Sequence, residues 1–391
     1  MTLALRLAQV KPSATLAVGA KAKLLKSQGH DVIDMSLGEP DFDTPDFVKA
    51  AAIAAINNGQ TKYTAVDGTP ELKAAICAKL KRDNHLDYKP ENVMATAGAK
   101  QGLYNLCMAI LSPGDEVIVP APYWVSYPEM ALLADATPVI IETDISQQFK
   151  ITAAQLEEAI TPKTKLFFLN SPSNPTGMIY TRKELAALGE VLKKHPQIII
   201  ASDEIYEYIV WNDEGFSGIL NVCPELKDRT VIFNGCSKAH AMTGWRLGYA
   251  AGPVNLIKAM STIQSQSTSN PCSITEAAGV VAIAATKSQL QYMFDVFKKR
   301  HDYFYREMTA LPLLETHPAD GTFYLFVDAK KAIQKLGMKD DIQLAEYLLE
   351  KALVACVPGT AFGAPNCLRF SYALSDAQLE KAVERLKKAL T

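Results

Sequence analysis

The sequence has no long hydrophobic run, no excess of one charge and few cysteines for its length. Its longest apolar stretch, residues 277–285, falls well short of the roughly 18 residues that a membrane span needs. Forty lysines and arginines balance 42 aspartates and glutamates, which argues against a nucleic-acid-binding protein. The seven cysteines include no CxxC pair, and Arg6 and Lys11 interrupt the region where a signal peptide would be apolar. We therefore expect a cytoplasmic globular protein with neither a membrane nor nucleic acid as its partner.

Motifs for common cofactors and metals are also missing. No GxGxxG follows a strand-like run, and neither GxxxxGK[ST] nor HExxH occurs in the 391 residues. The six histidines show no spacing typical of metal ligands. These absences weigh against nicotinamide-dependent, ATP-hydrolysing and zinc-dependent enzymes, and we expect no metal site.

Short apolar runs alternate with helical periodicity through the first two thirds of the chain. The apolar runs lie at residues 93–97, 116–120, 138–141, 165–169, 198–202, 231–233 and 247–251. Helical patterns fall between several of them, at residues 100–111, 124–134, 152–160 and 181–195. Fully apolar strands separated by amphipathic helices predict an α/β fold with a mostly parallel, seven-stranded sheet between layers of helices.

The pattern changes after about residue 273. A helical pattern continues through residues 275–309. Later elements are expected as strands at 322–327, 353–358 and 368–372 and as helices at 341–351 and 375–390. This part of the chain predicts a second, smaller α+β domain. We place the large domain at residues 46–290 and build the small, discontinuous domain from residues 1–45 and 291–391.

Lys238 follows an apolar strand and opens the turn SKAHAMTGWRLGY, which also carries Arg246. A charged lysine at the end of a buried strand is costly unless it is paired, solvated or chemically engaged. A Schiff base with an aldehyde cofactor removes that cost, and the Arg246 guanidinium suits a phosphate. Taken alone, both residues are explained more simply as ordinary surface cations.

Four further positions lie at the ends of strand-like runs, where α/β proteins gather ligands. Asp203 in SDEIY suits a protonated ring nitrogen, or a helix cap. Gly98 in GAKQ suits a phosphate cradle at a helix start, or an ordinary turn. Trp124 in PYWVSY suits ring stacking, although core packing is the commoner role. Asn174 in NSPSNPTG suits a ligand oxygen, or a simple Asn-Pro turn.

These motifs, with SLGEPDFDTP, TKYTAVDGTPELK and LRFSYA, occur in the order found in one family, and the match spans essentially the whole chain. The sequence resembles the pyridoxal-5'-phosphate-dependent class I/II aminotransferases of fold type I. Within that family it looks most similar to bacterial aspartate aminotransferases, including the bifunctional aspartate/prephenate aminotransferases. The resemblance implies the fold type I architecture, pyridoxal 5'-phosphate as the cofactor and a homodimer with shared active sites.

The resemblance also assigns roles to individual residues. Lys238 matches the lysine that binds the cofactor and moves the proton, and Asp203 matches the partner of the ring nitrogen. The other matches to cofactor-binding positions are Gly98, Ala99, Lys100, Trp124, Asn174, Tyr206, Ser237, Arg246 and, in the partner subunit's site, Tyr63. Arg369 matches the arginine that takes the substrate α-carboxylate, assisted by Gly38, Trp124 and Asn174. Of these residues, the resemblance makes Lys238, Asp203 and Tyr206 the catalytic ones.

Two departures from the family pattern concern the phosphate and the substrate side chain. Many members carry a serine three residues before the lysine, where this chain has Gly235, so Ser237 is the nearer hydroxyl. Others bind the distal carboxylate with an arginine from the segment that here reads QSQSTSN, residues 264–270. Because that segment contains no arginine, the resemblance offers Lys11 and Thr15 as the ligands of a second carboxylate.

The resemblance predicts transfer of the amino group of L-aspartate to 2-oxoglutarate, with prephenate as a further substrate. Two alternatives keep the cofactor: an aromatic or alanine aminotransferase, and a carbon–sulfur β-lyase. A transcriptional regulator on the same fold would carry a DNA-binding segment ahead of the family motifs, which here begin within the first 15 residues. We therefore expect an enzyme.

Overall fold

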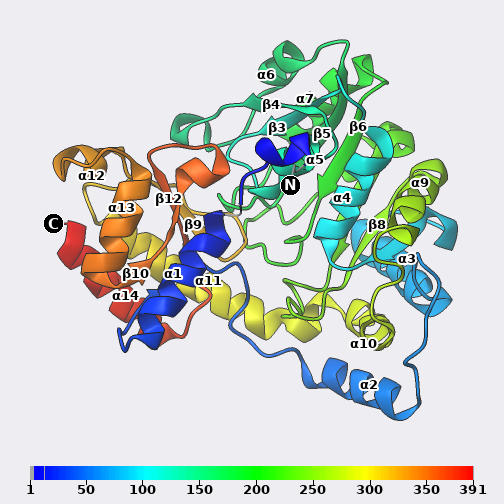
Figure 1. Cartoon of the computed structure of the whole chain (residues 1–391), viewed down its shortest axis with the longest axis horizontal. Coiled ribbons are helices and arrows are strands. Elements are labelled where there is room, and N and C mark those ends of the chain that lie inside the picture. The colour runs from blue at the N-terminus through cyan, green and yellow to red at the C-terminus, as the bar shows by residue number, and fades with distance from the viewer. Residues whose placement is uncertain (1–3, 13, 391) are drawn as a thin grey trace.

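A seven-stranded sheet forms the centre of the computed structural model, which describes residues 4–12 and 14–390 (Figure 1). The strand order is β2-β8-β7-β6-β5-β3-β4, and only β8 runs antiparallel to its neighbours. The strands are β2 (Val93–Thr96), β3 (Glu116–Pro120), β4 (Thr137–Ile141), β5 (Thr164–Asn170), β6 (Ile199–Asp203), β7 (Thr230–Gly235) and β8 (Gly248–Ala251). The predicted α/β fold with a mostly parallel sheet is confirmed.

Helices cover both faces of this sheet, and the strands are apolar throughout because each face is buried. In β3, Val117 and Val119 pack into one core while Ile118 packs into the other. The helices of the first core are α4 (Ala99–Ile110), α5 (Ser126–Leu133) and α9 (Val254–Ser265). The main helices of the second are α2 (Asp46–Asn57), α3 (Pro70–Asn84), α7 (Arg182–Lys194) and α10 (Ser273–Ala284). Two short helices, α6 (Ala153–Ala159) and α8 (Ile219–Val222), pack beside α7.

A second group of elements packs around a core of its own. Its antiparallel sheet has the order β11-β12-β9, with β9 (Tyr324–Asp328), β11 (Val357–Pro358) and β12 (Cys367–Ser371). Its helices are α11 (Lys287–Thr309), α12 (Lys330–Lys335), α13 (Asp341–Tyr347) and α14 (Asp376–Leu390). The N-terminal segment joins this group, because β1 (Ile33–Asp34) pairs in parallel with β10 (Val354–Ala355). Figure 1 shows helix α1 (Ala14–Ser27), in blue, beside the C-terminal elements in orange and red.

Three predicted elements are divided in the structure. The helical pattern at 275–309 forms two helices, because Ala285 is extended (ψ 138°) and the Thr286 main-chain N–H donates to Gln289 Oε1 over 2.9 Å at the start of α11. The predicted strand at 353–358 is two short strands, and Cys356 separates β10 from β11 in different sheets. The helix expected at 341–351 changes to a π-helical turn at residues 348–352. In the first two cases local capping or sheet pairing overrides the apolar pattern.

The cysteines do not cross-link the fold. All seven are free thiols, and Cys272 is the exposed one. Across the described residues, no helix is long and apolar enough to cross a membrane. Within the same ranges, no group of three or more His, Cys, Asp or Glu side chains is placed to hold a metal ion.

Candidate active site

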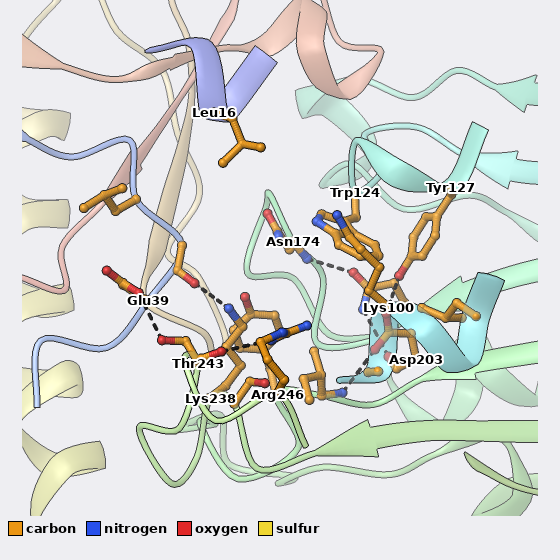
Figure 2. Close-up of a pocket in the computed structure, with 18 of the residues that line it drawn as sticks. Leu16, Glu39, Lys100, Trp124, Tyr127, Asn174, Asp203, Lys238, Thr243 and Arg246 are labelled. Atoms are coloured by element: carbon orange, nitrogen blue, oxygen red, sulfur yellow. Dashed lines mark hydrogen bonds between the residues drawn. The ribbon is translucent and has the colours of Figure 1, made fainter. Parts of the chain in front are cut away.

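A cavity of about 440 Å³ opens where the carboxyl ends of β5, β6 and β7 meet the N-terminal segment (Figure 2). Turns after neighbouring parallel strands converge at this edge, which is where α/β folds bind their ligands. The predicted residues that line the cavity are Gly38, Ala99, Lys100, Trp124, Asn174, Asp203, Tyr206, Ser237, Lys238 and Arg246. One cavity thus collects most of the positions that the motifs indicated.

Lys238 lies in the turn that follows β7. Its Nζ donates a hydrogen bond to the carbonyl oxygen of Gly38 in the N-terminal segment. Desolvation, together with the positive charge of Arg369, lowers the pKa of Lys238 to about 8. A lysine with this pKa is a neutral amine in a useful fraction of molecules near neutral pH, and the neutral amine is the nucleophile. Lys238 is therefore suited to attack an aldehyde carbon.

Asp203, the last residue of β6, is only 4% exposed. Burial raises the pKa of Asp203 to about 6. Two donors favour its ionised form: the Tyr127 hydroxyl, 2.7 Å from Oδ2, and the Ile205 main-chain N–H, 3.3 Å from Oδ1. A buried carboxylate gains strongly from a cationic partner, because the protein has removed its water. A protonated ring nitrogen fits that requirement.

Tyr206 and the asparagines complete this side of the cavity. The Tyr206 hydroxyl lies 2.9 Å from that of Tyr324, and burial raises its pKa so that it stays protonated. Asn170, at the end of β5, donates from Nδ2 to the Asp203 main-chain oxygen over 3.0 Å. Its Oδ1 accepts the Asn174 main-chain N–H over 2.9 Å. The turns after β5 and β6 are thereby fixed to each other.

Arg369 reaches the site through Asn174. Its Nη1 donates to Asn174 Oδ1 over 2.9 Å, and its Nη2 donates to the Ser36 carbonyl over 2.7 Å. The guanidinium is 2% exposed and lies 4.4 Å from the ring centre of Tyr324 and 5.0 Å from that of Phe362. Among the described residues, its Nε has no hydrogen-bond partner. A buried planar cation with an unused donor suits a carboxylate.

The turn between β2 and α4 forms an anion cradle. Gly98 has a φ of +82°, which favours glycine, and a Cβ atom there would lie 2.2 Å from Arg246 Nη2 and would displace that guanidinium. Helix α4 begins at Ala99, whose N–H group lies in the first turn, has no acceptor within the helix and belongs to its positive end. Lys100 Nζ lies 4.8 Å from the centre of the Trp124 ring (Figure 2). The cradle combines backbone donors with two cationic side chains.

Repulsion among the cations adds to the case for an anion. After desolvation, the charge of Arg246 contributes to the lowered pKa of Lys100 and, with that of Arg369, to the lowered pKa of Lys238. Positive charges gathered in a partly desolvated cavity repel one another, and a phosphate dianion reverses the sign of that interaction. The folded chain holds these like charges close together around the cavity.

The structure gives a physical reason for the glycine three residues before Lys238. A Cβ atom on Gly235 would lie 2.6 Å from the Leu247 carbonyl oxygen and 2.7 Å from Gly248 Cα, because β7 and β8 approach closely there. A serine cannot occupy that position without moving β8. Ser237 lines the cavity and is the hydroxyl that remains.

Gly98 and Arg369 adjoin residues of the cavity lining, and three further predicted residues lie away from it. Tyr63 is 94% exposed and borders a separate hollow between α2 and α10. Lys11 is exposed, and its main-chain N–H donates to Glu129 Oε2 over 2.8 Å. Thr15 is half-buried in α1. The roles assigned to these three residues stay predictions.

The motifs did not single out several residues that shape the cavity. Tyr127 had a signal, because it lies three residues after the predicted tryptophan in PYWVSY, at helical spacing. Asn170 ends β5, so the rule for strand ends would have found it. Glu39 and Thr243 had none: Thr243 Oγ1 donates to Glu39 Oε2 over 3.0 Å and links segments far apart in the chain (Figure 2).

Pyridoxal phosphate fits these residues group by group. The Lys238 amine would hold its aldehyde, Asp203 would hold its ring nitrogen, and the cradle at Gly98 and Arg246 would hold its phosphate. The fold and the donor set define a pyridoxal-phosphate-dependent transferase. The family Aminotransferase class I and II matches residues 30–386, and the chain belongs to it. The protein is therefore an aminotransferase with pyridoxal 5'-phosphate as its cofactor.

Individual relatives cover the chain from end to end. It is 49% identical to the aspartate/prephenate aminotransferase of Nitrosomonas europaea, with 100% of both chains aligned. It is 50% identical to the aspartate aminotransferase of Geobacillus stearothermophilus, over 99% of this chain and 98% of that protein. Among solved structures, aspartate aminotransferase from Rhizobium meliloti superposes with a TM-score of 0.95 at 45% identity, over 100% of this chain and 99% of that one. The Thermus thermophilus enzyme with maleate superposes at 0.94 and 43%, with both chains fully covered.

Proposed function

We propose that this aminotransferase moves the amino group of L-aspartate to 2-oxoglutarate, forming oxaloacetate and L-glutamate. One observation carries the proposal: Lys238, with its lowered pKa, and the buried Asp203 line one cavity, and the buried guanidinium of Arg369 lies behind Asn174. The names of relatives at 49–50% identity over the full chain supply the amino acid.

Each of the chain's own groups has a task in this proposal. Bound pyridoxal phosphate supplies an electron sink for the pair left when the substrate Cα–H bond breaks. The Lys238 amine removes that proton and returns it, while the Asp203 carboxylate keeps the ring nitrogen protonated. Tyr206 and Asn174 would hold the ring oxygen by donated hydrogen bonds, and Trp124 would stack against the ring. The Arg369 guanidinium orients the substrate by its α-carboxylate.

The side-chain carboxylate of aspartate needs a second cation. Lys11 and Thr15 remain candidates from the resemblance, and α1 brings Leu16, the neighbour of Thr15, to the mouth of the cavity. Lys100 is a further candidate, because its ammonium lies within the cavity wall over the Trp124 ring. A lysine in that position offers a point charge to a carboxylate that extends from the α-carbon.

The decisive experiment follows the visible absorbance of the bound cofactor in one half-reaction. Adding aspartate to the wild-type enzyme without a 2-oxo acid should convert the cofactor to its amine form and release oxaloacetate, and Lys238→Ala should not respond. Tyrosine and alanine serve as competing substrates. Ammonia and pyruvate released from cystathionine without a 2-oxo acid would instead identify a β-lyase.

Prephenate is the second candidate substrate, because relatives at 49% and 52% identity are named aspartate/prephenate aminotransferases. The enzyme preloaded with its amine-form cofactor should return to the aldehyde form when prephenate is added. A rate below a hundredth of that with oxaloacetate would restrict the proposal to aspartate.

We also propose a cytoplasmic homodimer, with the large domain at residues 46–290 and the small domain at 1–45 and 291–391. The exposure of Tyr63 beside the hollow between α2 and α10 supports a subunit interface there. If Tyr63 reaches the partner's phosphate, mixing Lys238→Ala and Tyr63→Phe subunits should restore activity, because each hybrid dimer then holds one intact site. Mixed subunits no more active than the weighted mean of the two variants would contradict shared sites.

A further inference from the structure

Tyr324 is a buried residue of β9 that contacts three groups of the active site. Its hydroxyl lies 2.9 Å from the Tyr206 hydroxyl. The guanidinium of Arg369 lies 4.4 Å from the centre of its ring. A Cβ atom on Gly38 would lie 2.8 Å from its hydroxyl oxygen, so the N-terminal segment packs directly on it. No motif in the sequence pointed to this residue.

The register of the small sheet explains the contact with Arg369. Tyr324 of β9 pairs with Ser371 of β12, and Arg369 is two residues before Ser371. Because successive side chains in a strand alternate between faces, Tyr324 and Arg369 emerge on the same face as diagonal neighbours. The tyrosine ring therefore supports the guanidinium through the rigid pairing of two strands.

In the hydrogen bond between the Tyr206 and Tyr324 hydroxyls, either phenol can be the donor. Burial raises the pKa of both phenols, so each keeps its single proton. In the proposed function, Tyr206 uses its proton to donate to the ring oxygen of the cofactor. Its own oxygen must then accept, and Tyr324 is the hydroxyl within hydrogen-bond distance. A donated hydrogen bond makes a phenol a stronger donor in turn.

We propose that Tyr324 is a positioning residue that orients the Tyr206 hydroxyl toward the cofactor and holds the Arg369 guanidinium for the substrate α-carboxylate. The proposal rests on the proposed function. Tyr324 would link Tyr206, the donor to the cofactor's ring oxygen, with Arg369, the residue that binds the α-carboxylate. The hydroxyl of Tyr324 contacts Tyr206 and its ring contacts Arg369, so the two roles can be separated by substitution.

Tyr324→Phe removes the hydroxyl and keeps the ring. Tyr206 then becomes a weaker hydrogen-bond donor, so the cofactor's ring oxygen keeps more electron density. That oxygen would stabilise the proton on the nearby Lys238 nitrogen more strongly. The pH at which the visible band of the loaded enzyme changes should rise by about 0.5 pH unit, as expected for the loss of one hydrogen bond. The KM for aspartate should change less than about twofold, because the ring still supports Arg369.

Tyr324→Leu removes the ring as well. The dissociation constant of maleate, a dicarboxylate without an amino group, should then rise about tenfold, since the guanidinium loses its aromatic support. With Tyr324→Phe that constant should stay within about twofold of wild type. Equal weakening of maleate binding in the two variants would overturn the role of the ring.

A double-variant titration tests the role of the hydroxyl. The pH titration compares wild type, Tyr206→Phe, Tyr324→Phe and the double variant. We expect both single variants to shift upward and the double variant to match Tyr206→Phe, because Tyr324 acts through Tyr206. The matched control is Tyr372→Phe, which removes a neighbouring buried hydroxyl whose donated bond, 3.3 Å long, goes to the Thr322 carbonyl; its titration should match wild type.

The outcomes separate this inference from the proposed function. If the wild-type chain takes up no pyridoxal phosphate, the proposed function fails. If the wild type loads and reacts with aspartate, but Tyr324→Phe titrates as wild type or its effect adds to that of Tyr206→Phe, the role of Tyr324 fails alone. Circular dichroism of each variant checks the fold, and the near-isosteric Tyr324→Phe carries the test if Tyr324→Leu does not fold.

Discussion

At the floor of the cavity Asp203 is 4% exposed and is held by Tyr127 and Asn170, whereas at the mouth Leu16 on α1 is 75% exposed. The floor is built from the ends of β5 and β6, where parallel pairing fixes one strand against the next. The mouth, which includes Lys23 and Leu16, comes from the N-terminal helix. Figure 2 shows Leu16 across the cavity from Asp203.

The difference between the buried floor and the exposed mouth suggests that the floor residues carry out the reaction and the mouth residues select the substrate. In the proposed function, the floor residues would contact the cofactor and the substrate α-carbon, which are the same for every amino acid. Residues nearer the mouth would contact the side chain, which differs between amino acids. Substitutions at the floor should therefore lower the turnover of all substrates together, and substitutions farther out should change their relative order.

The largest effect should come from Lys238→Ala. Without the amine that binds the cofactor and moves the proton, kcat should fall about 10⁴-fold or more for every amino acid tested. Borohydride treatment of the loaded protein should add the mass of the cofactor to the wild type and not to this variant. Lys23→Ala is the matched control at the mouth, and a loss of similar size there would erase the distinction between the two regions.

Asp203→Asn should lower kcat about 10³-fold, because the ring nitrogen loses a fixed negative charge in a buried site. Burial raises the pKa of Asp203 to about 6 in the protein without cofactor. A protonated ring nitrogen beside it would lower that pKa, so wild-type activity should persist at pH 6 and fall only at lower pH. Tyr127→Phe removes a donor to the ionised form and should move the acidic limb of the kcat/KM profile to higher pH. An unmoved limb would show that Asp203 does not control it.

Lys100→Met should raise the KM for aspartate by about 10- to 100-fold, the cost of one charged hydrogen bond, and leave the KM for alanine nearly unchanged. Lys11→Met is the competing variant. If Lys11→Met has the larger effect on aspartate alone, the second carboxylate binds at the N-terminal segment. Equal losses for aspartate and alanine in Lys100→Met would instead assign Lys100 to the cofactor.

Loading of the cofactor should depend on pH. Because desolvation and Arg369 lower the pKa of Lys238 to about 8, the amine is mostly charged at pH 7 and mostly neutral at pH 9. The rate at which the cofactor-free protein takes up pyridoxal phosphate should therefore rise about tenfold between these values. Stopped-flow absorbance measures it, and a rise of about 100-fold, which a lysine with its ordinary pKa of 10.5 would give, would contradict the lowered pKa.

Much of the fold could be predicted because its strongest signals are local. The strands at 116–120 and 198–202 are apolar on both faces, and the structure places them inside the sheet with cores on either side. The break between α10 and α11 was missed because the apolar pattern runs across it. Thr286 and Gln289, three residues apart, were the capping signal that indicates a new helix start within residues 275–309.

The cavity was less predictable where contacts cross between distant segments. Asp203 and Lys238 were visible because each lies at or just after the end of its own strand. Tyr324 was not, because its importance comes from the pairing of β9 with β12. The orientation of exposed side chains was also not predictable. The resemblance offered Lys11 as a ligand of the second carboxylate, but a sequence does not show which way an exposed lysine points.

The pairing of β1 with β10 has a consequence for how the protein is made. Ile33 leaves the ribosome early, but its partner Val354 is synthesised near the end of the chain. At bacterial-like elongation rates the delay is on the order of tens of seconds. During that interval β1 has no strand to pair with. The segment after β1, which brings Gly38 to the cavity lining, is therefore anchored only after translation is nearly complete.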